Sequence, residues 1–140
     1  MVFSRNFLSL PQEIAKLADD FEAWGRSMRL EPRAINCANL ILDELLTNIV
    51  KYGYKNQVPG NIELHITFIG KNIEIIVRDQ GSPFNLLDVQ EPDVSKDLDS
   101  RTTGGLGIYF VRQLADNVFY RRDGDVNEVV LHISMQQPLD

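Results

Sequence analysis

Hydrophobic residues recur along this chain with two different periods, one helical and one strand-like. Apolar residues three or four apart predict helices over residues 11–28 and 32–53, and each helix begins with a proline that suits the first turn. Over residues 62–68 and 73–77, apolar residues alternate with other residues, and this period of two predicts strands. Because only a short turn separates these two strands, we expect an antiparallel hairpin.

The remaining predicted elements complete a simple order along the chain. A short strand is predicted over residues 2–8, a third helix over about 106–115, and a closing hairpin over 118–122 and 128–135. This order predicts a two-layer α+β fold, in which helices pack on one face of a mixed, largely antiparallel sheet. A chain of 140 residues is expected to form one domain, residues 1–140.

Residues 85–103 carry neither pattern and form a long predicted loop. The segment is about as long as structureless loops become in compact domains. Its acidic residues outnumber its two cations, Lys96 and Arg101. The loop lies between two of the candidate motifs described below. Its position therefore favours a mobile lid that covers a functional site.

The composition is typical of a soluble globular protein and argues against several classes of site. The chain is 44% hydrophobic, and its net charge of −6 argues against direct nucleic-acid binding, which requires a basic surface. The single cysteine, Cys37, lies in a helical apolar pattern and is expected to be a small buried hydrophobe. The two histidines lie far apart, so no zinc site is expected. Without a membrane-spanning run or a signal-peptide pattern, the chain is expected to be cytoplasmic.

A carboxylate and a carboxamide lie one turn apart on the second predicted helix. Glu44 and Asn48 are four residues apart, so their side chains point the same way beside the apolar stripe. The Asn48 carbonyl oxygen could bind Mg²⁺, which prefers oxygen ligands, and Glu44 could accept a proton from water or from a protein hydroxyl. The alternative is a solvated helix face, where both residue types are common.

A carboxylate followed by a glycine ends the second strand of the predicted hairpin. Asp79 could accept a hydrogen bond from the exocyclic amine of adenine, and Gly81 would let the backbone approach the base closely. Phe84 could line the apolar mouth of such a pocket. The alternative is an ordinary turn after a strand.

Glycines precede the third predicted helix. The segment Gly104-Gly105-Leu106-Gly107 leads into an apolar helical run, and glycines at a helix start expose backbone N–H groups that attract phosphate. The alternative is a flexible entry into the helix. Neither the P-loop pattern nor the Rossmann glycine pattern is present.

In order along the chain, these three motifs resemble the N, G1 and G2 boxes of the GHKL ATPase superfamily. Its members include gyrase, Hsp90, histidine kinases and MutL. The chain is similar above all to the branch of bacterial anti-sigma factor serine/threonine kinases, along residues 41–54, 77–85 and 104–111 and again at 127–129. Tyr52 stands where many relatives carry histidine.

The resemblance implies a Bergerat ATP-binding fold and a site for ATP with Mg²⁺. It implies that Asn48 holds magnesium, that Glu44 is the general base, and that Asp79 binds adenine. Gly81 would serve the base pocket, and Gly104, Gly105, Leu106 and Gly107 would lie at the phosphates. Of the two cations in the predicted lid, Arg101 is the better candidate for the γ-phosphate because it stands beside the glycines.

The same resemblance implies a protein serine/threonine kinase that acts as an anti-sigma factor. Such a kinase phosphorylates a STAS-type anti-anti-sigma partner, binds a sigma factor and forms homodimers. The first alternative is a non-catalytic ATP-binding partner-switching module that regulates a phosphatase or other signalling protein. A stand-alone ATP hydrolase is the second. A complete histidine kinase and a gyrase- or MutL-type ATPase are not expected, because neither a phosphoacceptor helix nor a second domain is predicted.

Overall fold

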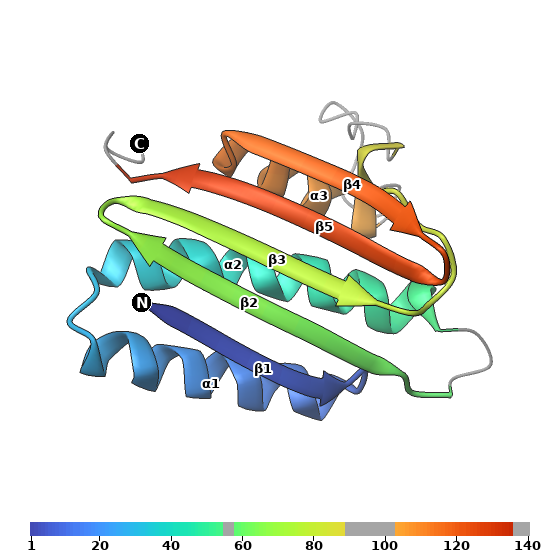
Figure 1. The fold of residues 1–140 in the computed structure, drawn as a ribbon, viewed down its shortest axis with the longest axis horizontal. Coiled ribbons are helices and arrows are strands. Elements are labelled where there is room, and N and C mark those ends of the chain that lie inside the picture. Colours follow the sequence, from blue (N-terminus) through green and yellow to red (C-terminus); the bar gives the residue numbers. More distant parts are fainter. Residues whose placement is uncertain (55–57, 89–102, 136–140) are drawn as a thin grey trace.

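The computed structural model describes residues 1–54, 58–88 and 103–135, and side chains within these ranges except at 103–106. The order of elements follows the sequence prediction closely (Figure 1). The strands are β1 (Val2–Leu8), β2 (Asn61–Ile69), β3 (Asn72–Asp79), β4 (Asn117–Asp123) and β5 (Val126–Ser134). The helices are α1 (Pro11–Ser27), α2 (Pro32–Asn48) and α3 (Thr103–Leu114), with a π-helical turn at Ile49–Gly53 and a 3-10 turn at Leu86–Asp88.

Within the described ranges the strands form a five-stranded sheet in the order β1-β2-β3-β5-β4. Every pairing of these strands is antiparallel, so the expected mixed sheet has no parallel pair in this part of the chain. The two predicted hairpins are β2–β3 and β4–β5. The pairing that joins them, β3 with β5, sets Asp79 opposite Asn127.

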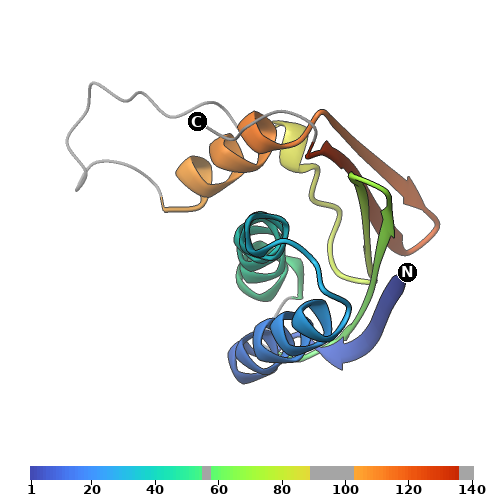
Figure 2. The same cartoon turned by 90° about the vertical axis from the view of Figure 1, so that its left-hand side faces the viewer.

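The described helices lie on one face of the sheet, as the sequence predicts (Figure 2). Alternation along the strands turns Ile62, Leu64 and Ile66 toward these helices, where they are fully buried. From the helices, Phe21 and Leu46 meet them in the same core. The fold therefore has two layers, and its core lies between the sheet and the helices.

The prediction for the single cysteine is confirmed, and several aromatic residues pack beside the core. Cys37 is buried, and burial raises the pKa of its thiol, which makes it a packing residue. Phe7, Trp24 and Tyr120 are half-buried and pack against the core.

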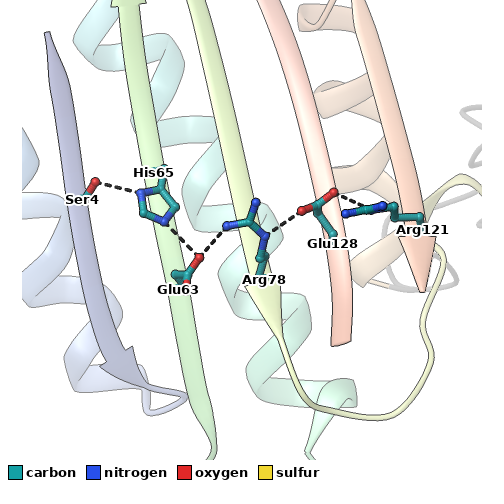
Figure 3. A network of polar contacts seen from close by, with 6 residues as sticks. All are labelled: Ser4, Glu63, His65, Arg78, Arg121 and Glu128. Atoms are coloured by element: carbon teal, nitrogen blue, oxygen red, sulfur yellow. Dashed lines mark hydrogen bonds and ion pairs between the residues drawn. The ribbon is translucent and has the colours of Figure 1, made fainter. Parts of the chain in front are cut away.

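The opposite face of the sheet carries a chain of polar contacts that crosses all five strands (Figure 3). Arg78 of β3 donates to Glu63 of β2 at 2.5 Å and to Glu128 of β5 at 2.6 Å. On one side, this series of contacts continues from Glu128 to Arg121 on β4. On the other side, it continues from Glu63 through His65 to Ser4 on β1. Its central pair, Arg78 and Glu128, are cross-strand partners directly beside Asp79 and Asn127, so the ion pair stabilises the register that brings those two residues together.

These polar contacts shift the pKa values of Glu63 and Glu128. The hydrogen bond from Arg78, followed by the one from His65, holds the pKa of the Glu63 carboxyl below its ordinary value. Burial acts to raise the pKa of Glu128, but its bonds from Arg78 and Arg121 outweigh burial and lower it.

Two boundaries differ from the sequence prediction. The second helix changes from α to π geometry after Asn48, although the helical segment ends at Gly53 as expected. The third helix begins at Thr103, about three residues before its predicted start, so the glycines form its first turn. Glycine is a poor helix former, and its low propensity made these residues look like a lead-in segment.

The predicted lid lies mostly outside the described residues. Its first residues form a turn, in which the Asn85 side chain accepts a hydrogen bond from the Leu87 N–H at 2.9 Å. Residues 89–102, with Arg101 among them, are not described. Among the helices of the described ranges, none combines the length and the apolar character that a membrane span requires.

Candidate nucleotide-binding site

Residues of the first two sequence motifs line one pocket, and Ile108, directly after the third motif, lines it as well. The pocket lies between the end of α2, the end of β3, the start of β5 and helix α3. Asn48 and Asp79 contribute polar groups to its wall, and Val77, Phe84 and Ile108 contribute apolar surface. A mostly apolar cavity with a few polar groups is the ordinary form of a site for a small organic ligand.

One carboxylate oxygen of Asp79 accepts hydrogen bonds from described residues, and the other accepts none from them. Its side chain is buried, with 7% of the residue exposed. Oδ1 accepts hydrogen bonds from the Gly81 N–H at 2.8 Å and from Asn127 Nδ2 at 3.1 Å. No described residue donates to Oδ2, so this oxygen can accept a hydrogen bond from a ligand, as predicted for the amine of adenine.

Gly81 lies against the backbone of Gly53, at the end of the π-helical turn. A Cβ at position 81 would lie 2.5 Å from the Gly53 carbonyl oxygen, which already accepts the Ser82 N–H at 2.6 Å. The close approach that requires glycine here is therefore between two segments of the protein. An additional role of Gly81 toward a base stays a prediction.

Asn48 has a carbonyl oxygen that fits the predicted role of magnesium ligand. The residue is 5% exposed, and its Nδ2 donates to the Glu44 carbonyl oxygen one turn earlier at 2.7 Å. No described residue donates to its Oδ1. Directly after Asn48 the helix takes its π-helical turn, a distortion that is frequent at functional sites.

The donor set also fits a magnesium ion bound together with phosphates. Among the described residues, no group of three or more His, Cys, Asp or Glu side chains could hold a metal by itself. Magnesium keeps several waters and takes few protein ligands when it is bound with a nucleotide, so one amide oxygen suits it.

Glu44 brings the first motif into contact with the third. The half-buried carboxylate lies so close to Gly107 of α3 that any side chain at position 107 would overlap it. Burial, followed by repulsion from Asp43, raises the pKa of Glu44, while Lys51 opposes the rise. Glu44 makes no ion pair with any described residue. A half-buried, unpaired carboxylate with a raised pKa has the properties of a general base or acid.

The glycine motif supplies the N-terminal turn of α3. Gly104 and Gly105 lie in this turn with Leu106 and Gly107 after them, so the N–H groups of the turn have no helical partner of their own. Such a terminus attracts anions, and Glu44 lies beside it. The phosphate-binding role of these four residues stays a prediction.

Phe84 contributes its ring to the pocket wall, and its role toward a base stays a prediction. Its ring stacks on Tyr52, with ring centroids 6.0 Å apart and planes inclined by 24°. Tyr52, the residue that departs from many relatives, therefore supports one side of the apolar wall.

Two polar groups near the site were not singled out from the sequence. The Asn127 carboxamide, 4% exposed, lies in the pocket wall beside Asp79. Alternation along 127–133 was a usable signal, because it places Asn127 on the same face as the buried Val129 and Leu131. The Tyr54 hydroxyl accepts the Gln80 N–H at 2.8 Å and donates to the Asn61 carbonyl at 2.7 Å, so it ties the loop after β3 to β2.

Comparisons with known proteins agree with this geometry. A family model described as the histidine kinase-like ATPase domain matches residues 7–133. A protein named serine-protein kinase RsbW from Listeria monocytogenes is 29% identical over 101 residues, which cover 69% of this chain and 64% of that protein. The protein of the same name from Staphylococcus aureus is 28% identical over 109 residues, or 74% of this chain and 69% of that protein. The chain thus spans about two thirds of the length of these relatives.

A solved structure shows the same fold at low sequence identity. The histidine kinase AdeS of Acinetobacter baumannii superimposes with a TM-score of 0.50 over 95% of this chain and 68% of that chain, at 13% identity. Because the family match extends over nearly the whole sequence, the chain belongs to the histidine kinase-like ATPase domain family.

Proposed function

We propose that the protein is an ATP-dependent protein serine/threonine kinase that acts as an anti-sigma factor. One observation carries this proposal, the contact of the Glu44 carboxylate with Gly107 at the start of α3, one turn from Asn48. A module that only binds ATP needs an adenine pocket and a phosphate site, but it has no need of a carboxylate at the helix end where phosphate is attracted.

The pocket supplies the binding half of this function. Asp79 would accept a hydrogen bond from the adenine amine through Oδ2, and Phe84 and Ile108, which line the pocket, would contact the base. Asn48 would hold Mg²⁺ through Oδ1, and Gly104, Gly105 and Gly107 would present backbone N–H groups to the phosphates. Bound with ATP, magnesium neutralises the phosphate charge and aligns the phosphates for in-line transfer.

Glu44 supplies the catalytic half. A substrate serine or threonine hydroxyl that reaches the start of α3 would donate its proton to the Glu44 carboxylate while its oxygen attacks the γ-phosphorus. The bond from the γ-phosphorus to the oxygen that bridges it to the β-phosphate would break, and ADP would leave. The raised pKa makes Glu44 a stronger base than an exposed glutamate, because burial disfavours its charged form. The unpaired state of Glu44 among the described residues leaves it able to accept that proton.

The partners follow from the resemblance and from charge. We propose that the substrate is a serine or threonine of a STAS-type anti-anti-sigma protein and that a sigma factor is the second partner. Two relatives over most of this chain are named serine-protein kinases. The net charge of −6 suits a partner with a basic surface, such as a sigma factor.

The proposal is tested by phosphotransfer from labelled ATP to the STAS protein encoded nearest to this chain. We expect transfer by the wild type, and we expect Glu44→Ala to abolish transfer while ATP affinity stays within a few-fold. Asp43→Asn is the matched control, because it neutralises the exposed carboxylate next to Glu44 and should leave transfer in place. Unchanged transfer in Glu44→Ala would refute the base assignment. ATP binding by the wild type without transfer to the STAS protein would instead favour the partner-switching module.

A further inference from the structure

The Asn127 carboxamide is bonded at both of its ends. Its Oδ1 accepts hydrogen bonds from the Tyr120 hydroxyl at 2.6 Å and from Arg122 Nη1 at 3.2 Å, both on β4. Its Nδ2 donates to Asp79 Oδ1 at 3.1 Å and to the Ser82 carbonyl oxygen at 2.9 Å. A buried carboxamide with this many partners has little freedom to reorient.

Only one orientation of this carboxamide satisfies its neighbours. A half-turn about the last side-chain bond would set Oδ1 of Asn127 against a carboxylate and a carbonyl, and Nδ2 against a guanidinium. Both placements are repulsive, and each would leave a buried polar group unpaired. Tyr120 and Arg122 thus hold one end of the carboxamide from the neighbouring strand, while its other end donates to Asp79.

The bonds to Asp79 hold its carboxylate in place. Oδ1 already accepts two N–H groups, from Gly81 and from Asn127. The remaining oxygen, Oδ2, is an acceptor in the pocket wall, so a ligand group that meets it must be a donor. Arg122 also donates to the Gly81 carbonyl oxygen at 2.7 Å, which holds the loop that carries the Gly81 N–H.

We propose that Tyr120 and Arg122 are positioning residues that determine base selection through Asn127 and Asp79. By holding the Asp79 carboxylate in place, they let its remaining oxygen favour a purine with an amino group, adenine, over one with a carbonyl at the same position, hypoxanthine. This inference rests on the proposed ATP site. It adds two residues on β4 that the three motifs do not contain.

The test compares the dissociation constants of ATP and of inosine triphosphate, which differ at the group that would face Asp79. The variants are Tyr120→Phe, Arg122→Gln and the two combined, with thermal melting to follow the fold. We expect the preference of the combined variant for ATP over inosine triphosphate to fall by about tenfold, since Asn127 loses the bonds from β4 and no longer holds the Asp79 carboxylate firmly in place. Arg122→Lys retains a positively charged donor on a longer side chain than glutamine and should restore most of the preference lost in Arg122→Gln.

Arg121→Gln is the matched control, because Arg121 is the neighbouring arginine on β4 and bonds to Glu128 on the opposite face of the sheet. It should leave the preference unchanged. Equal weakening of both nucleotides in the Tyr120 and Arg122 variants would show a purely structural role and would overturn the inference. The inference would also be overturned if both Tyr120→Phe and the combined variant kept the wild-type preference for ATP over inosine triphosphate. A wild type that binds neither nucleotide would overturn the proposed ATP site itself, which separates the two failures.

Discussion

Gly81→Ala is expected to destabilise the fold strongly, although the residue lies in a loop. The added methyl group would lie 2.5 Å from the Gly53 carbonyl oxygen, 2.7 Å from the Gly53 carbonyl carbon and 3.0 Å from Asp79 Oδ1. Two of these three atoms belong to the backbone, which cannot rotate away as a side chain can. The loop after β3 must therefore move away from the end of the π-helical turn.

The size of the effect follows from the contacts that this movement breaks. Separating the two segments weakens the bond from Ser82 N–H to the Gly53 oxygen, and an unmade buried hydrogen bond costs about 1–3 kcal/mol. Forcing a methyl group into packed structure costs another 1–3 kcal/mol or so. The lower entropy of alanine in the unfolded chain offsets about 0.4–1 kcal/mol. We expect a net loss of about 2–4 kcal/mol in the free energy of unfolding.

Urea denaturation and thermal melting measure this loss. An unfolding entropy of about 2.1 cal/mol/K per residue gives roughly 0.3 kcal/mol/K for 140 residues, so the melting temperature should fall by about 7–14 °C.

Gly107→Ala is the matched control for stability. Its methyl group overlaps only the flexible end of the Glu44 side chain, and alanine favours a helix over glycine by about 1 kcal/mol. This control should melt near or above the wild type. The reasoning is refuted if Gly81→Ala unfolds within about 0.5 kcal/mol of the wild type, the range of an ordinary surface substitution.

Three further predictions concern the polar groups of the site and of the sheet. Asn48→Ala should abolish the magnesium dependence of ATP binding in calorimetry, because it removes the amide oxygen in the pocket wall; normal magnesium-dependent binding would exclude the ligand role. Glu44→Gln should raise the melting temperature at pH 7, because the raised pKa of Glu44 means that burial disfavours its charged form. This gain should vanish below the ordinary carboxyl pKa of 4.5, and an equal gain at every pH would contradict the cause. The lowered pKa of Glu63 stabilises the fold above pH 4.5, and this contribution is lost as the pH falls through the lowered value. Glu63→Gln should therefore be less stable than the wild type at pH 7 and approach it in acid; acid melting curves that keep the same separation would disprove this linkage.

Local patterns were sufficient to predict most of the elements. Strand β1 has the predicted bounds, and α1 begins at the predicted proline, because a period of two and a fixed φ are properties of neighbouring residues. The start of α3 was predicted about three residues too late. Glycine has a low helix propensity, so nothing in the sequence indicated that the glycines form the first turn.

Pairings between distant residues could not be predicted in the same way. Arg78 and Glu128 are 50 residues apart, and nothing near either residue in the chain indicates the other. Their contact depends on the position of β5 beside β3, which also brings Asn127 to Asp79. The bonds that orient Asn127 then come from β4, which lies beside β5 at the edge of the sheet.

The sequence alone indicated the class of fold, the family and the three motifs. It did so because hydrophobic period, proline and glycine positions, and short motifs are all local. The tertiary structure was needed to show why Gly81 must be glycine, that Glu44 touches Gly107, and that Tyr120 and Arg122 bond to Asn127, which bonds to Asp79. Each of these depends on distances between segments far apart in the chain, and these distances exist only once the sheet has formed and the helices have packed against it.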